Sequence, residues 1–440
     1  MLDLAFWFFF IITPITIWFM LRIAGERINK ISILNITTIS IYIFSFIGLI
    51  PLYFKLDPYN LSTGITNENL VFTILLYSFI SIFSFLLGNI FIRRVLQLKP
   101  LVINSKLLRP LKKQNIIMLF CFFCLVLLVL FVYLKKVNKV AIFTVFTEGA
   151  LAASKARSDM GNNFPKYHRY SFFMHDLGLI VALSFFILWL QGRTIKRFVC
   201  FLFSSIVYSF ICIMAIEKAP FIFFMFSLIM AYTIAHKDCL ISIRKLIIPG
   251  IIFTVILTSF FYFFMGNANI QVALNSLFSR AFASSIAPTY YYLEYIPYIN
   301  DFYWGKTFPN PAHIFPYDAI RYTVEIFNWK NPHLTLHGIT GSYPTVFWGE
   351  AYVNFGFWGI PIISFIMGNI VAFASYLLSI LEVNAISIAL NVWAIMHFMT
   401  LGTTGFSGFL YDFNLIGISI FVLIILTVSG KLKIRKKSIV

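Results

Sequence analysis

The sequence predicts an all-α polytopic membrane protein that crosses the bilayer about eleven times. Hydrophobic residues make up 60% of the 440-residue chain, 53 residues are Phe, and only 11% are charged. This composition leaves too little polar surface for a water-soluble domain of that length. Several segments run for about eighteen or more residues almost without charge, which is enough for a helix to cross roughly 30 Å of hydrocarbon. They lack the alternating pattern of barrel strands.

We expect one integral membrane domain over residues 1–440. Its spans are predicted at residues 4–24, 33–55, 69–92, 116–134, 172–191, 198–215, 221–235, 246–266, 358–380, 386–402 and 413–430. A single helix over 198–235 would be about 57 Å long, so a break at 217–220 is required. No small-residue cleavage site follows the first span, so we expect it to be retained.

Basic residues in alternate connections predict the orientation, with the N-terminus outside and the C-terminus in the cytoplasm. The predicted inner segments carry Arg22, Arg27, Lys30, Arg93, Arg94, Lys99, Lys106, Arg109, Lys112, Lys113, Arg193, Lys196, Arg197, Lys237, Arg244, Lys245, Lys431, Lys433, Arg435, Lys436 and Lys437. The formal charge of +18 is therefore explained by the excess of Lys and Arg in cytoplasmic connections, which sets the orientation of the helices. A nucleic acid is for this reason not an expected partner.

Motifs for cytosolic nucleotide or metal chemistry are missing from the sequence. We find no Walker A loop, no GxGxxG after a strand, no HExxH and no Asp-x-Asp. Cys121 and Cys124 form a CxxC among Phe and Leu in a predicted span, where a redox or metal site is not expected. We therefore expect neither a cofactor nor a metal.

The first large outer loop, residues 135–171, is basic although it lies on the predicted outer side, where orientation in the membrane does not require basic residues. It contains Lys135, Lys136, Lys139, Lys155, Arg157, Lys166 and Arg169 against Glu148 and Asp159. This excess predicts an anionic ligand such as a phosphate or diphosphate. Contact with lipid headgroups is the alternative.

The second large outer loop, residues 267–357, is rich in proline and aromatic residues. Prolines favour short helices joined by rigid turns, and residues 274–287 have the apolar spacing of a helix lying in the membrane interface. Its aromatic residues fit an interfacial belt or platforms for sugar stacking, and the sequence does not separate the two. They are Tyr290, Tyr291, Tyr292, Tyr295, Tyr298, Tyr303, Trp304, Trp329 and Trp348.

The end of this loop, GSYPTVFWGEAYVNFGFWGI, places Glu350 and Asn354 at i, i+4 on one helical face. A carboxylate at that depth is costly unless it is paired or used, and a capping or snorkelling role is the alternative. Lys218, beside Glu217 in the turn at 216–220, either neutralises its neighbour or binds a lipid diphosphate.

Three segments of the sequence resemble motifs of a known protein family. The GSYPTVFWGEAYVNFGFWGI stretch is similar to the Gly-Glu-x-Tyr-x-Asn-Phe-Gly signature of bacterial oligosaccharide repeat unit polymerases, the Wzy-type O-antigen and capsule polymerases. SRAFASSIAPTYYYLEYIP and WGKTFPNPAHIFP resemble the family's Arg-containing loop helix and its continuation. In IEKAPFIFF, Lys218 stands where relatives often carry arginine.

The resemblance implies a metal-independent membrane glycosyltransferase of GT-C-like architecture in the bacterial cytoplasmic membrane. It would extend glycans carried on undecaprenyl diphosphate, at the outer face, with a chain-length regulator as a further partner. Cations at the surface would stabilise the diphosphate leaving group, and a carboxylate or imidazole would accept the proton of the attacking hydroxyl. The candidate bases are Glu350 and His337, and the candidate substrate contacts are Arg157, Arg169, Lys218, Arg280, Arg321, Tyr352 and Asn354.

Two alternatives stay open. An O-antigen ligase uses the same donor and differs only in its acceptor. A lipid-linked oligosaccharide flippase or other transporter would show paired repeats and ionisable residues or broken helices near the middle of the membrane. In the predicted spans, His397 is the main ionisable residue near a centre.

Overall fold

The computed structural model describes residues 2–97, 108–161, 163–237, 239–240, 251, 255, 258, 271, 274, 277–310, 313–336, 341–428 and 430. The described part of the chain is helical and has no strand. Ten of its helices are long and apolar enough to cross a membrane, which confirms the all-α polytopic class. The predicted span 246–266 lies almost wholly outside the described residues. The chain divides into two compact units.

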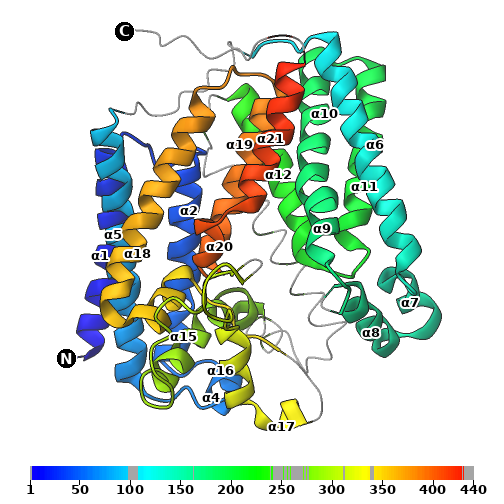
Figure 1. Ribbon diagram of the computed structural model, residues 1–440. Coiled ribbons are helices and arrows are strands. Elements are labelled where there is room, and N and C mark those ends of the chain that lie inside the picture. The colour runs from blue at the N-terminus through cyan, green and yellow to red at the C-terminus, as the bar shows by residue number, and fades with distance from the viewer. Residues whose placement is uncertain are drawn as a thin grey trace. The chain divides into compact units, whose positions relative to one another are not determined.

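Unit 1 contains the first three spans and most of the span that follows the second predicted loop. α1 (Leu2–Ile23) and α5 (Glu68–Val95) lie side by side (Figure 1). α2 (Ile33–Tyr42) continues through the π-helical turn η1 (Ile43–Ile47) into α3 (Leu49–Tyr53), and the short α4 (Pro58–Ser62) follows.

Small residues let α5 and α18 (Phe347–Ser379) approach closely. Small residues are common at such contacts because the hydrophobic effect does not drive helices together in lipid, so close packing has to stabilise the pair. A Cβ on Gly88 would meet the Phe365 carbonyl oxygen, and one on Gly368 would meet the Phe85 carbonyl oxygen. Asn89 adds a hydrogen bond from its side-chain amide to the Gly368 carbonyl oxygen at 3.2 Å.

The second predicted loop folds onto these helices within unit 1. It forms the π-helical turn η4 (Ser279–Ala283), α15 (Ser284–Tyr295), α16 (Tyr322–Lys330) and α17 (Pro332–Leu336). The predicted interfacial helix over 274–287 is therefore wrong at its end, because the helix continues to Tyr295 with Pro288 inside it. The π-helical turn η4 directly precedes α15.

The tyrosines of α15 serve as buried anchors, which neither sequence-based reading anticipated. The Tyr290 hydroxyl accepts a hydrogen bond from the Asn67 amide at 3.1 Å, and the Tyr291 hydroxyl donates to Thr63 Oγ1 at 2.7 Å. Both side chains are 2% exposed. Tyr298 and Trp304 are, by contrast, 82% and 71% exposed. For these two residues, an interfacial belt and a platform for sugar stacking both stay predictions.

Unit 2 contains α6 (Lys113–Lys136), α10 (Gly178–Gly192), α11 (Ile195–Ile213), α12 (Lys218–His236), α19 (Ala385–Met399) as far as His397, and α21 (Phe413–Thr427). The break required at 217–220 is confirmed, since α11 ends at Ile213 and α12 begins at Lys218. The first predicted loop folds into α7 (Ala141–Glu148), α8 (Ala150–Met160) and α9 (Tyr167–Ser171), which the π-helical turn η3 (Phe172–Leu177) joins to α10.

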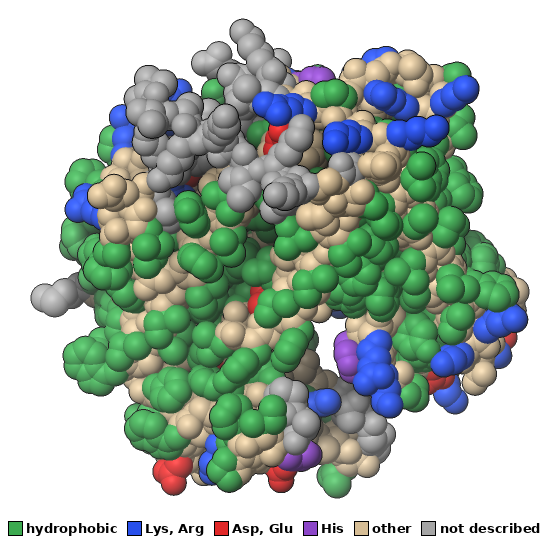
Figure 2. Space-filling model, turned by 45° about the horizontal axis from the view of Figure 1, so that its top comes forward, with side chains coloured by type: hydrophobic (Ala, Val, Ile, Leu, Met, Phe, Trp, Pro, Cys, Tyr) green, Lys and Arg blue, Asp and Glu red, His purple; other side chains and the backbone are tan. Residues whose placement is uncertain are grey.

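Side chains on the face in Figure 2 are sorted as a bilayer requires. Hydrophobic side chains cover the flanks of the helices, and Lys and Arg side chains gather towards the helix ends. In unit 2, Arg109 pairs with Glu382 at one end of the helices, and Arg157 pairs with Glu217 at the other end. These charges therefore mark the ends of the apolar belt.

Candidate functional site

Glu350 lies in the first turn of α18, which starts at Phe347. The predicted span 358–380 corresponds to the part of α18 that follows a bend at Gly356, and a short helical segment precedes this bend. Gly356 has φ +62°, a conformation that costs other residues energy, and a Cβ there would lie 3.1 Å from the Phe302 ring. The short helical segment before this bend holds Glu350 beneath the folded loop.

The Glu350 carboxylate is 1% exposed and is held by neutral donors from two other segments. Thr307 Oγ1 donates to Oε1 at 2.7 Å, and the Ser407 amide donates to Oε2 at 3.0 Å. No ion pair with Glu350 occurs among the residues that the structure describes. A buried carboxylate without a cation is costly, which makes Glu350 a candidate for a functional group.

Asn354, one turn further along α18, completes this network. Its side-chain amide donates to Thr307 Oγ1 at 2.7 Å and to the Glu350 carbonyl oxygen at 2.9 Å, and its Oδ1 accepts from the Gly305 amide at 2.8 Å. The predicted i, i+4 pair therefore exists, and it binds the segment Tyr303–Thr307 to the helix. Asn354 is fully buried, so it positions neighbouring groups in this structure.

Gly405 and two tyrosines close the other side of Glu350. A Cβ on Gly405 would collide with the Glu350 carboxylate and would lie 2.9 Å from the Tyr322 hydroxyl. The Tyr322 and Tyr292 rings pack edge to face with their centroids 5.6 Å apart, and the Tyr292 hydroxyl donates to the Tyr343 carbonyl oxygen. Burial raises the pKa of Tyr322 and Tyr292, and the nearby Glu350 raises both pKa values further. Both tyrosines therefore remain protonated at neutral pH.

Exposed groups lie directly beside this buried network. Trp304 and Lys306 alternate with Gly305 and Thr307, and both side chains are exposed. The Ile320 amide donates to the Lys306 carbonyl oxygen at 2.8 Å, which brings the exposed Arg321 into the adjacent segment. In the described part of the chain, neither Lys306 nor Arg321 forms an ion pair. The surface next to Glu350 therefore offers an aromatic face and two cations.

Other predicted residues of the second loop have different surroundings. Tyr352 is 8% exposed, and its hydroxyl donates to the Ile296 carbonyl oxygen at 3.1 Å, so it anchors the loop. Arg280 is exposed in η4. His337 lies outside the described residues.

The remaining predicted contacts belong to unit 2. Arg157 pairs with Glu217 at 3.5 Å, and Arg169 is exposed on α9. Lys218 begins α12, and its side chain lies outside the described part. A cavity of about 680 Å³ adjoins α7 and α8. Its charged lining residues are Lys136, Lys139, Glu148, Lys155 and Asp159. The basic loop thus has a concave surface with an excess of lysine.

Unit 2 also contains ionisable residues in its spans. His397 Nε2 lies 2.7 Å from Asp412 Oδ2, and the Trp393 indole donates to Asp176 Oδ1 at 3.0 Å. The Trp393 and His397 rings are stacked with their centroids 4.9 Å apart. The sequence pattern drew attention only to His397. Asp176 and Trp393 are 217 positions apart in the chain, so their contact could not be predicted from local spacing.

No group of three or more His, Cys, Asp or Glu residues that could hold a metal occurs among the described residues. In the comparisons with known proteins, no family model, no curated protein and no solved structure matches the chain. The physical arrangement around Glu350 therefore supplies the argument for function.

Proposed function

We propose that this protein polymerises oligosaccharide repeat units carried on a lipid diphosphate, without a metal, at the outer face of a bacterial cytoplasmic membrane. Undecaprenyl diphosphate is the proposed carrier, and O-antigen, capsule or a related surface polysaccharide is the proposed product. The observation that carries the proposal is the arrangement of the segment Trp304–Thr307. Its Thr307 hydroxyl contacts the buried Glu350 carboxylate, while Trp304 and Lys306 remain exposed.

The proposed reaction is a displacement at the anomeric carbon of the donor sugar. A hydroxyl of the acceptor forms the new glycosidic bond, the bond from the anomeric carbon to the carrier oxygen breaks, and the lipid diphosphate leaves with the electron pair. Lys306 and Arg321 stabilise the negative charge that develops on this leaving group. Trp304 offers a face on which a sugar ring can stack.

Glu350 accepts the proton of the attacking hydroxyl in this scheme. Because its carboxylate is 1% exposed, we place Thr307 between Glu350 and the acceptor. Thr307 Oγ1 passes its own proton to Glu350, 2.7 Å away, as it takes the proton of the acceptor. Asn354 and the Ser407 amide hold these two groups in position.

A transporter of lipid-linked oligosaccharides is the second candidate. It is favoured by the ionisable side chains in the spans of unit 2, namely Asp176 beside Trp393 and His397 beside Asp412. Such residues within a membrane mark transport pathways and proton relays in other proteins. A ligase is a third candidate, because it shares the donor and the leaving group with a polymerase.

A strain that lacks the gene distinguishes these candidates. We expect long chains to disappear while single repeat units still reach the cell surface, where they are detected by gel electrophoresis of surface glycans. Loss of single units as well would contradict polymerisation and indicate a ligase or a transporter. In complementation, Arg321→Ala and Glu350→Ala are expected to abolish long chains without loss of membrane insertion. Near-normal polymer from both variants would overturn the site assignment.

A further inference from the structure

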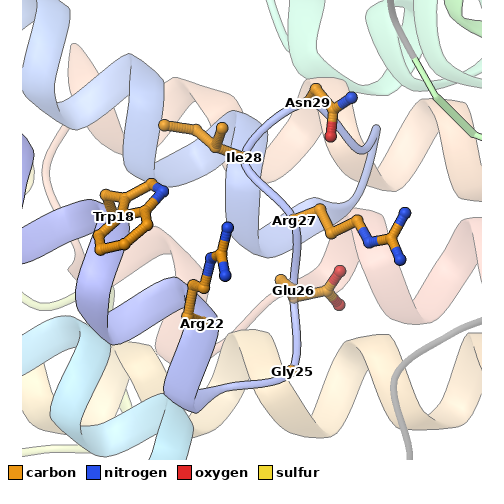
Figure 3. Close-up of a pocket in the computed structure, with 7 residues that line it drawn as sticks. All are labelled: Trp18, Arg22, Gly25, Glu26, Arg27, Ile28 and Asn29. Atoms are coloured by element: carbon orange, nitrogen blue, oxygen red, sulfur yellow. The ribbon is translucent and has the colours of Figure 1, made fainter.

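A second concave site lies in unit 1 where α1 ends. This pocket of about 450 Å³ is lined by Trp18, Arg22, Gly25, Glu26, Arg27, Ile28 and Asn29 (Figure 3). α1 and α5 are both candidate membrane spans that end beside it, at Ile23 and Val95. A pocket at the end of membrane-spanning helices lies at the depth of lipid headgroups.

The acidic residue of this pocket is already neutralised. Glu26 is 2% exposed, its Oε1 lies 3.3 Å from Arg93 Nη2, and its Oε2 lies 3.1 Å from Lys30 Nζ. This buried group of three charges holds the connection between α1 and α2 against α5. The charges of Arg22 and Arg27 therefore make the pocket cationic.

Arg22 has the geometry of a phosphate ligand. Its guanidinium carbon lies 4.7 Å from the centre of the Trp18 ring, and Trp18 is 45% exposed. This is a cation–π distance, and the planar fork of N–H donors of a guanidinium can bind a phosphate in bidentate fashion. Among the described residues, no acidic side chain pairs with Arg22 or Arg27. Figure 3 shows Arg22 beside Trp18, with the Arg27 side chain turned away from them.

An apolar surface continues from the pocket along α1. Ile11, Ile15 and Phe19 are 58%, 54% and 58% exposed, and their spacing of four residues places them on one side of the helix. A soluble phosphate would leave this surface unused. The acyl chains of a lipid whose phosphate lies at Arg22 would cover it.

We propose that this pocket binds the phosphate of an anionic glycerophospholipid. Arg22 contacts the phosphate, Trp18 packs against the glycerol region, and Arg27 adds positive charge from the connecting segment. Basic pockets between transmembrane helices bind anionic headgroups by the same chemistry. This inference is independent of the reaction proposed for Glu350.

The test is a titration of the purified, detergent-solubilised protein with phosphatidylglycerol, phosphatidylcholine or inorganic phosphate, with bound lipid counted by native mass spectrometry. We expect phosphatidylglycerol to bind more tightly than phosphatidylcholine, and inorganic phosphate to compete poorly. Arg22→Ala is expected to weaken phosphatidylglycerol binding by about tenfold, which corresponds to one lost bidentate contact. Arg27→Ala is expected to have a smaller effect.

Two matched variants serve as controls. Arg94→Ala removes another exposed cation, from the end of α5, and Arg193→Ala removes an arginine that lies 4.7 Å from the centre of the Trp189 ring in unit 2. Both are expected to bind phosphatidylglycerol like the original protein. Arg22→Lys preserves charge and folding, and should still weaken binding because lysine lacks the planar fork. Equal binding of both lipids, tight binding of inorganic phosphate, or equal losses in the controls would overturn the proposal.

Discussion

Thr307 is the residue through which the exposed surface and the buried carboxylate meet. Its hydroxyl donates to Glu350 and accepts from Asn354, both at 2.7 Å. The sequence pattern drew attention to Glu350 and Asn354, because both lie on one helical face. It did not indicate Thr307, because a threonine between Lys306 and Phe308 has no distinctive spacing and the contact spans 43 positions in the chain.

Replacing Thr307 by Val should leave both Glu350 Oε1 and the Asn354 amide without this partner. An unsatisfied buried polar group costs about 1–3 kcal/mol, so the thermal midpoint of the solubilised protein should fall by a few degrees and polymer formation should be lost. Thr307→Ser retains the hydroxyl and should preserve both properties. Equal behaviour of the two variants in a melting curve and a polymer gel would argue against the role of this hydroxyl.

Gly405 lies where no side chain fits. A Cβ there would meet the Glu350 carboxylate and the Tyr322 hydroxyl, so Gly405→Ala should cost about 1–3 kcal/mol and disturb the site. Gly408 offers a control three residues later, since a Cβ there would meet nothing within 4 Å. A thermal melting curve should shift for Gly405→Ala and not for Gly408→Ala. Unchanged melting in both variants would contradict the close packing of Gly405 against Glu350 and Tyr322.

At the scale of elements, the site depends on how closely α18 approaches α5. Gly368→Ala would force a methyl group against the Phe85 carbonyl oxygen, and this backbone cannot move without separating the two helices. We expect a lower thermal midpoint and weaker polymer formation, because α18 also carries Glu350. Gly408→Ala again provides the comparison, and an unaltered melting curve for Gly368→Ala would contradict the close approach.

Helices inside the bilayer were more predictable than those in the second loop. Apolar length alone locates a span, because the hydrocarbon must be crossed and every backbone group must be satisfied internally. The predicted span 358–380 matches the part of α18 after the bend at Gly356, and the i, i+4 spacing of Glu350 and Asn354 predicted the helical segment before it. The anchoring roles of Tyr290 and Tyr291 depend on contacts with Asn67 and Thr63, which local pattern does not contain.

For the whole molecule, charge and hydropathy were sufficient for the class and for ten spans, whereas the candidate site required the fold. Glu350 was predicted from its depth and its helical neighbour, but Thr307 and Ser407 come from segments far from it in sequence. Arg157 and Arg169 stay predictions as substrate contacts, and they belong to unit 2. The polymerase function likewise stays a proposal, supported by Glu350 and the exposed groups beside it.

Reconstitution tests the central claim most directly. The purified protein in lipid nanodiscs is given oligosaccharides linked to a lipid diphosphate, isolated from its own source, and the products are separated on a gel. The original protein and Asp318→Asn, which changes an exposed carboxylate of the same loop, should both produce a ladder of longer chains. Glu350→Gln keeps the size of the side chain and should slow chain growth by on the order of 10²-fold or more. A ladder formed by Glu350→Gln at the original rate would contradict the account.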